Sequence, residues 1–325
     1  MSNPFFTAFA AASCALMLSA CSDSGRPDFV SIGTAPPGGA FFVVGGALGE
    51  VLNAHAEGNN WQVNSESTMG SQENISRLAQ GELDLAMSNA AITYFAVRGE
   101  GEWPAAQPVE AVMTLAPNVA LFITTAGSGV TTIAELKGKR VVIGPPGAGF
   151  ESFVAPILEA HGVKMTDITP LNATQAGAVD MLSDGSAAAA FLGGAIPTAS
   201  ISQAAASQDI FFIPFDPEVR AGLVRDYPFF HDATIPGGTY RGQDADFLGL
   251  NVGSMHLITS ATQDEDLVYR ITKTLYENRE DAAEKHPAGK AINPANVVRH
   301  TGTDFHAGAI RYYKEIGIWT ADKPE

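Results

Sequence analysis

Apolar residues repeat along the chain in two alternating patterns, and this alternation predicts an α/β fold. Residues 29–35 (FVSIGTA) and 61–67 (WQVNSES) have the composition and spacing of strands. Residues 45–54 (GGALGEVLNA) have apolar positions at helical spacing, Ser71 is the expected N-cap of a second helix, and residues 83–87 (LDLAM) form a third strand. This order, within about 60 residues, predicts right-handed βαβ units and a mostly parallel sheet.

The same order of elements restarts further along the chain. Residues 120–125 and 140–143 have the pattern of strands, and a helix is expected between them at 132–136. A glycine-rich turn at 144–149 then leads into a helix at 151–161. The chain is therefore predicted to form two lobes of similar construction.

The carboxy-terminal part of the chain is expected to cross back to the first lobe. Residues 247–259 are extended, 265–285 form a long amphipathic helix, and 306–316 form a further helix. The alanine-rich run 186–191 (SAAAAF) fits either a helix or a strand.

The first 20 residues have the features of a secretory signal. They contain no charged side chain and are apolar from Phe5 to Leu18, which is too short for a membrane span but suits a signal h-region. The run ends in Leu-Ser-Ala-Cys at 18–21, which resembles the lipobox of bacterial lipoproteins and makes Cys21 the expected lipid anchor. The alternative is an ordinary small-residue cleavage site followed by a chance cysteine, because the n-region has no Lys or Arg.

Composition and charge narrow the class of protein. The chain has 325 residues, of which 46% are hydrophobic and 17% charged, so it can bury a large core and suits two lobes. Its 19 Lys and Arg against 35 Asp and Glu give a net charge of −16, which argues against nucleic acid as a partner. The only cysteine besides Cys21 is Cys14, within the signal, so the mature chain is expected to have no internal disulfide.

No motif for common enzyme chemistry occurs in the sequence. H-E-x-x-H, C-x-x-C and G-x-S-x-G are missing, and the seven His are too scattered to suggest a metal site. Residues 144–149 have the glycine spacing of a Walker A loop, but Phe150 stands where Lys must reach the phosphates and Glu151 where a hydroxyl must hold magnesium. We therefore expect no catalytic residue, no metal and no enzymatic activity.

Four turns that follow predicted strands are rich in glycine and small polar residues. They cover residues 33–42, 67–71, 88–91 and 144–152. Such turns offer free backbone N–H groups and the positive end of a helix dipole to a polar or anionic ligand. Any single turn is also what an ordinary βα connection prefers. Four of them, at the carboxyl ends of strands in two lobes, predict a ligand cleft.

Residues 29–319 resemble the TAXI solute receptors of tripartite ATP-independent periplasmic (TRAP) transporters. Five segments carry the resemblance: SIGTAPPGGAFFVVGGALGEVLN (31–53), ESTMGSQENISRLAQGELDLAMSN (66–89), LKGKRVVIGPPGAGFES (136–152), TIPGGTYRGQDAD (234–246) and FHAGAIRYYKEIGIW (305–319).

The resemblance implies a two-lobed periplasmic binding-protein fold, type II-like, with parallel or mixed sheets, a hinge and a ligand cleft. It also implies a small carboxylated or amino-acid-like ligand, delivery to a TRAP-type membrane permease and no cofactor. The domains expected after the signal (1–20) and a tether (21–27) are a first lobe at 28–115, a second lobe at 116–246, and a return to the first lobe at 247–325.

The chain departs from the family where hydroxyl groups are common. Members commonly carry Thr-Tyr or Val-Tyr at Ala40-Phe41, often Tyr at Phe42, and Ser-Gly-Thr at 148–150. Loss of these hydroxyls predicts a more apolar ligand, or a carboxylate held by backbone N–H groups alone. Phe42 either lines the cleft or packs in the core.

Within these turns and the resembling segments, the candidate ligand-binding residues are Thr34, Gly39, Phe41, Phe42, Ser67, Gly70, Ser71, Asn74, Asn89, Gly147, Ala148, Gly149, Phe150, Phe191 and Gly194. Several have a structural alternative. Asn89 either faces the ligand or bonds its own backbone, Asn74 either reaches the cleft or stabilises a helix start, and Gly194 either belongs to a family Gly-x-Pro segment or forms a tight turn.

The sequence thus predicts an exported, lipid-anchored protein of the periplasm that captures a small organic ligand and passes it to a TRAP-type permease. The alternative is a ligand-sensing lipoprotein that reports to a membrane sensor through the same cleft.

Overall fold

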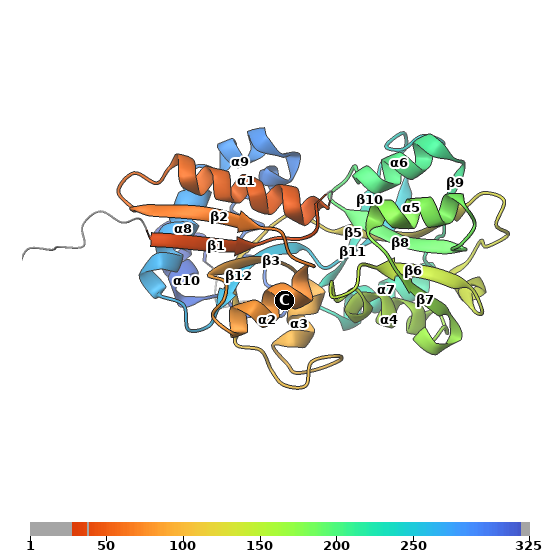
Figure 1. Cartoon of the computed structure of the whole chain (residues 1–325), viewed down its shortest axis with the longest axis horizontal. Coiled ribbons are helices and arrows are strands. Elements are labelled where there is room, and N and C mark those ends of the chain that lie inside the picture. Colours follow the sequence, from red (N-terminus) through yellow and green to blue (C-terminus); the bar gives the residue numbers. More distant parts are fainter. Residues whose placement is uncertain (1–27, 38, 320–325) are drawn as a thin grey trace, which may run out of the picture.

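The computed structural model describes residues 28–37 and 39–319 and shows two α/β lobes side by side (Figure 1). The carboxy-terminal helices, drawn in blue, lie on the lobe that also contains the red and orange amino-terminal elements (Figure 1). The predicted signal, the tether and Cys21 lie outside the described residues.

Five strands form the sheet of the first lobe, in the order β2-β1-β3-β12-β4. β1 is parallel to β2 and β3, whereas β12 is antiparallel to both β3 and β4. A strand from the carboxy-terminal part of the chain therefore lies inside the amino-terminal lobe. The strands are β1 (Asp28–Gly33), β2 (Trp61–Glu66), β3 (Leu85–Asn89), β4 (Val109–Thr114) and β12 (Met255–Ser260).

Helices cover both faces of this first sheet. Leu85 and Met87 of β3 share a core with α1, α8 and α10, whereas Ala86 between them shares a core with α2 and α3. The strand pleat produces this alternation, and burial on both faces explains the apolar run that predicted the strand. The helices are α1 (Ala40–Ala54), α2 (Ser71–Ala79), α3 (Ala90–Ala96), α8 (Glu265–Glu277), α9 (Arg279–Lys285) and α10 (Ala307–Glu315).

The second lobe contains a seven-stranded mixed sheet in the order β10-β11-β5-β8-β6-β7, with β9 also pairing with β5. β6 is parallel to β7 and β8, and β5 is antiparallel to β8, β9 and β11. The strands are β5 (Val119–Thr125), β6 (Arg140–Gly144), β7 (Thr169–Asn172), β8 (Ala189–Gly194), β9 (Ile210–Phe212), β10 (Phe230–Ile235) and β11 (Phe247–Val252).

Four α-helices flank this second sheet, and short 3-10 helices occur in both lobes. The α-helices are α4 (Glu151–Ala160), α5 (Gln175–Ser183), α6 (Ala199–Ser207) and α7 (Pro217–Asp226). The 3-10 helices are Ile133–Leu136, Met165–Asp167 and Pro287–Ala291.

The chain crosses between the lobes twice, after β4 and after β11, and the crossing segments bond to each other. The Asn118 N–H donates to Asn251 Oδ1 at 3.0 Å, and the Val252 N–H donates to the Asn118 carbonyl at 2.9 Å. Phe247–Val252 still belongs to the second sheet, so the chain changes sheet at residues 253–254, later than the expected boundary at 247. The crossings are the natural position for a hinge.

Two elements differ from their sequence patterns for local reasons. The ambiguous run 186–191 ends in β8, all six residues of which are buried, so a strand buried on both faces explains the lack of alternation. The helix expected at 265–285 is divided into α8 and α9 at Asn278, whose φ of −107° is not helical and whose Nδ2 donates to the Thr274 carbonyl at 2.9 Å.

His256 is a fully buried titratable side chain in the centre of the first sheet. It lies on β12, and its Nε2 is 3.5 Å from Thr301 Oγ1. Burial, with a smaller contribution from the charge of Arg299, lowers the pKa of His256 to about 3. The folded protein therefore holds this imidazole neutral, whereas the unfolded chain protonates it below its ordinary pKa of 6.5.

We predict that His256 makes the protein less stable as the pH falls. The contribution of the neutral His256 to the free energy of unfolding is complete above pH 6.5 and decreases as the pH falls from there toward 3. Between pH 7 and pH 5 the free energy of unfolding should fall by about 2 kcal/mol. Urea unfolding of the wild type and of His256→Gln at pH 7 and pH 5 measures this loss. The variant should lose about 2 kcal/mol less than the wild type on acidification, and equal losses would contradict this assignment.

Candidate functional site

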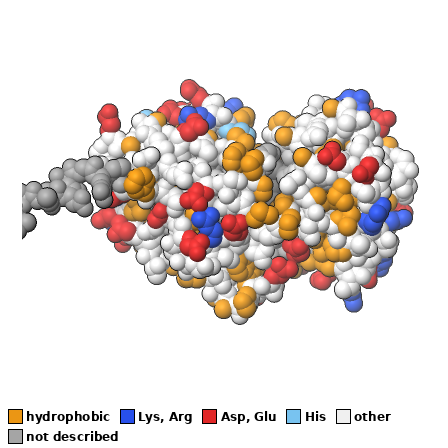
Figure 2. Space-filling view, viewed as in Figure 1, with side chains coloured by type: hydrophobic (Ala, Val, Ile, Leu, Met, Phe, Trp, Pro, Cys, Tyr) orange, Lys and Arg blue, Asp and Glu red, His pale blue; other side chains and the backbone are white. Residues whose placement is uncertain are grey.

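A cavity of about 330 Å³ lies between the two lobes, at the carboxyl ends of their strands. From the first lobe it is lined by Ala35, Pro36, Pro37, Gly39, Ala40, Phe41, Met69, Gly70, Ser71 and Asn89. From the crossing segment and the second lobe it is lined by Asn118, Pro145, Ala148, Phe150, Thr174, Gln175, Ala176, Gly193, Ala199, Ser200 and Gln203. In the space-filling view, hydrophobic side chains gather where the lobes meet (Figure 2).

The structure brings part of the candidate set together in this lining. These residues are Gly39, Phe41, Gly70, Ser71, Asn89, Ala148 and Phe150. Of the aromatic candidates, Phe41 from α1 and Phe150 from the turn before α4 are in the lining, and Phe42 is half-buried outside it. Phe150 also packs on Phe153, with ring centroids 5.0 Å apart.

Three other candidates are buried beneath or behind the lining. Thr34 Oγ1 donates to the Glu66 carbonyl at 2.6 Å, and Asn74 Nδ2 donates to the carbonyls of Thr34 (2.7 Å) and Met87 (2.8 Å). These bonds tie the ends of β1, β2 and β3 together. Phe191, which is 1% exposed, packs between Phe122 and Phe153 in the core of the second lobe.

The remaining candidates lie next to the cavity, in turns or, for Gly194, at the end of β8. Ser67 Oγ donates to the Ala35 carbonyl at 3.2 Å. A Cβ added at Gly147 would meet the Met69 side chain, one at Gly149 would meet Ile92, and one at Gly194 would meet Ala40. Each of these glycines therefore allows a close approach between the two lobes, and none is in the lining itself.

The sequence reasoning missed Asn118, Thr174, Gln175 and Ser200. Thr174 and Gln175 follow β7, so the rule that located the other turns also applies to them. Ser200 lies in the first turn of α6, after β8. Asn118 gave no local signal, because it precedes a strand and reaches the cavity only through the crossing of the chain.

Four helices begin at the cavity without a side-chain cap. The N-caps of α1, α2, α4 and α6 are Gly39, Gly70, Phe150 and Thr198, and none of their side chains accepts a hydrogen bond from the helix. First-turn N–H groups of α1, α2 and α6 are therefore open to a ligand at the positive ends of the dipoles, whereas the Ser152 and Phe153 N–H groups of α4 donate to the carbonyls of Gly149 (3.1 Å) and Phe150 (3.2 Å). The arrangement suits a carboxylate or another small anionic group.

The expectation that Ser71 caps α2 is wrong. Gly70 is the N-cap and Ser71 is the first helical residue. Gly70 has φ 121°, which favours glycine, and an added Cβ would lie 3.4 Å from Ala148 of the other lobe. The Ser71 hydroxyl oxygen instead accepts the Asn89 N–H at 3.0 Å, and its own hydrogen has no acceptor among the residues that the structure describes.

The amide side chains of the lining divide into occupied and free groups. Asn89 Nδ2 donates to the Gly253 carbonyl at 2.9 Å, and its Oδ1 accepts the Ala91 N–H at 2.8 Å, so it braces the crossing segment. Gln175 Oε1 accepts the Ser200 hydroxyl at 2.6 Å. Asn118 is 5% exposed, and within 28–37 and 39–319 its carboxamide forms no hydrogen bond.

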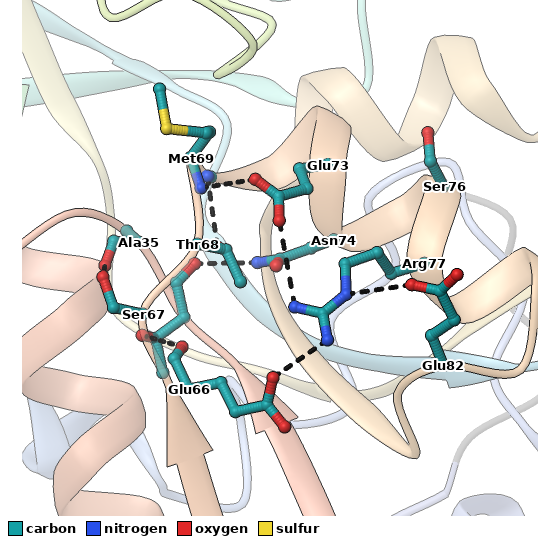
Figure 3. A network of polar contacts seen from close by, with 12 residues as sticks. Ala35, Glu66, Ser67, Thr68, Met69, Glu73, Asn74, Ser76, Arg77 and Glu82 are labelled. Carbon is teal, nitrogen blue, oxygen red and sulfur yellow. Dashed lines mark hydrogen bonds and ion pairs between the residues drawn. The ribbon is translucent and has the colours of Figure 1, made fainter.

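A network of charges supports the turn that carries Met69 and Gly70 (Figure 3). Glu73 Oε2 accepts the Met69 N–H at 2.8 Å. Arg77 contacts Glu66 at 2.9 Å, Glu82 at 3.4 Å and Glu73 at 3.8 Å, and the hydrogen bond that it donates to Glu66 is the largest cause of its raised pKa. One guanidinium thus joins the end of β2, the first turn of α2 and the loop after it.

A second cavity, of about 800 Å³, opens beside the same crossing segment. Pro117 and Val119 line it, whereas Asn118 between them lines the first cavity, as the alternation of an extended segment requires. None of the candidate residues from the sequence lines the second cavity. The first cavity is therefore the candidate ligand site.

Two α/β lobes, two chain crossings and a cavity between the lobes define the fold class of periplasmic solute-binding proteins, which confirms the fold class expected from the sequence. The sequence profile of the NMT1-like family matches residues 32–317. The chain belongs to the NMT1-like family.

Solved structures with similar folds share little sequence with the chain. A protein from Bordetella bronchiseptica RB50 is 15% identical over 91% of each chain, with a TM-score of 0.53. A Xanthomonas citri protein bound to ATP is 9% identical over 89% of this chain and 95% of that chain, with a TM-score of 0.52. The periplasmic aliphatic sulphonate binding protein SsuA from Escherichia coli is 14% identical over 82% of this chain and 77% of that chain, with a TM-score of 0.46.

Two kinds of feature are absent from the part of the chain that the structure describes. No helix there is long and apolar enough to cross a membrane. No group of three or more His, Cys, Asp or Glu side chains there is placed to hold a metal ion.

We predict that Arg77→Met destabilises the protein by about 1–2 kcal/mol, because it leaves three carboxylates close together without their shared cation. Urea unfolding measures the loss, which should shrink at high salt as the carboxylates are screened. Arg225→Met is the matched control, since that side chain is 74% exposed and, among the residues that the structure describes, forms an ion pair only with its neighbour Asp226. Equal effects of the two variants would contradict a supporting role for Arg77.

Proposed function

We propose that the chain is an exported solute-binding protein that captures a small organic acid between its lobes and delivers it to a TRAP-type permease. The observation that carries the proposal is the cavity between the lobes, where four helices begin without a side-chain cap. These helix starts come from both lobes, so their N–H groups can converge on one anionic group only when the lobes are close.

The size and composition of the cavity support a compact and partly apolar ligand. Its volume of about 330 Å³ is near the lower end for small-molecule sites, about 300–1,000 Å³. Phe41 and Phe150 supply apolar surface from the two lobes, in place of the hydroxyl-bearing residues common in the TAXI family. The ligand is therefore proposed to carry a carboxylate on an apolar body.

Closure of the lobes is the proposed signal to the permease. Residues on both sides of the hinge line the cavity, so a bound ligand favours the closed arrangement by contacting both lobes at once. Delivery to a TRAP-type permease is supported by the five segments that resemble TAXI receptors. The chain itself is proposed to perform no chemistry on the ligand.

A thermal-shift screen tests ligand capture. Organic acids, aromatic acids, amino acids and short fatty acids are added to the purified protein, and a ligand at about 100 times its dissociation constant should add about 2.7 kcal/mol to the stability. Phe41→Ala with Phe150→Ala should reduce the shift, because both rings are in the lining, whereas Phe42→Ala should not. If no compound shifts the wild type and the denatured protein releases no small molecule, ligand capture is wrong.

A separate test concerns the proposed lipid anchor. The wild type should enter the detergent phase of a Triton X-114 extraction, because an acyl chain on Cys21 gives it membrane affinity. Cys21→Ser should move to the aqueous phase, and Cys14→Ser, within the signal, should behave like the wild type. Recovery of the wild type in the aqueous phase would contradict lipidation.

A further inference from the structure

The lining of the cavity carries no charged side chain among the residues that the structure describes. This stands out in a chain of net charge −16 with 35 Asp and Glu. A buried ammonium group needs a nearby carboxylate or several oxygen acceptors, and without them its burial is strongly unfavourable. The cavity is therefore better suited to an acid than to an amino acid.

Three carboxylates that are close in sequence to lining residues are engaged elsewhere or lie outside the lining. Glu73 bonds the Met69 N–H and contacts Arg77, and Glu66 bonds Arg77. Glu151 follows the lining residue Phe150, but it is half-buried outside the lining. None of these side chains is placed to neutralise an ammonium group inside the cavity.

The oxygen acceptors of the lining are also mostly occupied. Asn89 Oδ1 accepts the Ala91 N–H, and Gln175 Oε1 accepts the Ser200 hydroxyl. The Gly193 carbonyl accepts Gln175 Nε2 at 2.8 Å, and the Gly70 carbonyl accepts the Asn74 N–H at 3.0 Å. An ammonium group would find few free oxygens besides Asn118 Oδ1, and one amide oxygen does not replace a counter-charge.

Donors, in contrast, are available in the same lining. Asn118 is nine-tenths buried, its backbone is fixed by Asn251 and Val252, and its carboxamide has no partner within the described part of the chain. The Ser71 hydroxyl already accepts the Asn89 N–H, so its hydrogen can be donated to a ligand. Both donors add to the open N–H groups of the helix starts.

We infer that the site selects organic acids that lack an ammonium group, and that Asn118 determines this selectivity by donating its amide hydrogens to the ligand. The inference rests on the proposed function and narrows the class of ligand to carboxylic acids that carry no ammonium group. Selectivity then arises in two ways: donors stabilise the carboxylate, and the missing counter-charge rejects the zwitterion.

The test compares ligands that differ only in the ammonium group. Calorimetric titration of the full chain in mild detergent uses 3-phenylpropanoate against phenylalanine, and butanoate against 2-aminobutanoate, with detergent alone as the blank. At least one acid should bind about 100-fold more tightly than its amino acid. Equal or tighter binding of the amino acids would overturn the inference while leaving solute capture intact.

Substitutions at Asn118 assign the selectivity to this residue. Asn118→Asp keeps the shape but adds a carboxylate, so affinity for the acid should fall about 100-fold and the preference over the amino acid should narrow or reverse. Asn118→Ala removes the donor without adding charge, and it should lower the affinity for the acid about tenfold. If the ratio of the affinity for the acid to the affinity for the amino acid is unchanged in both variants, the role of Asn118 is overturned.

Glu151→Gln is the matched control, because it changes a carboxylate close to the cavity but outside its lining. The ratio of affinities should stay as in the wild type, and a large change would mean that Glu151 meets the ligand and would overturn the inference. Should the wild type bind neither class and release nothing on denaturation, the proposed function fails, and the inference fails with it.

Discussion

The hydrogen bonds between the two crossing segments are the constraint on which the rest of the site depends. Asn118 bonds Asn251 and Val252, and the Met255 N–H donates to the Ala116 carbonyl at 2.9 Å. Asn89, at the end of a first-lobe strand, bonds the Gly253 carbonyl of the same crossing. The lining of the cavity and the hinge therefore share Asn118, so this donor keeps its position when the lobes move.

An uncharged site within a strongly acidic protein follows from the energetics of burial. An Arg or Lys in the lining would attract an anion, but it would have to be desolvated whenever the lobes closed without one. Helix N-termini carry only partial charges, and their N–H groups are fixed by the backbone. Uncapped starts such as those of α1, α2 and α6 thus offer binding energy at a smaller desolvation cost.

The sequence located the elements better than the side chains. Gly39, Gly70 and Phe150, which the sequence places in turns after strands, line the cavity between the lobes, because a turn after a parallel strand must lie at one edge of the sheet. Phe191 was also expected in the cleft, but it lies in the apolar strand β8 and packs into the core. One residue of register decides which face of a sheet a side chain occupies, and composition does not specify that register. Asn118 could not be located from sequence, because its place depends on how distant segments cross.

The division of the lining between the lobes also determines how a ligand is released. Met69, Gly70 and Ser71 come from one lobe, and Ala148 and Phe150 from the other. Affinity is a property of the closed arrangement alone, because opening separates the two sets of helix starts and returns the ligand to water. A partner that favours the open lobes therefore lowers the affinity without contacting the ligand, which is what the proposed transfer to a permease requires.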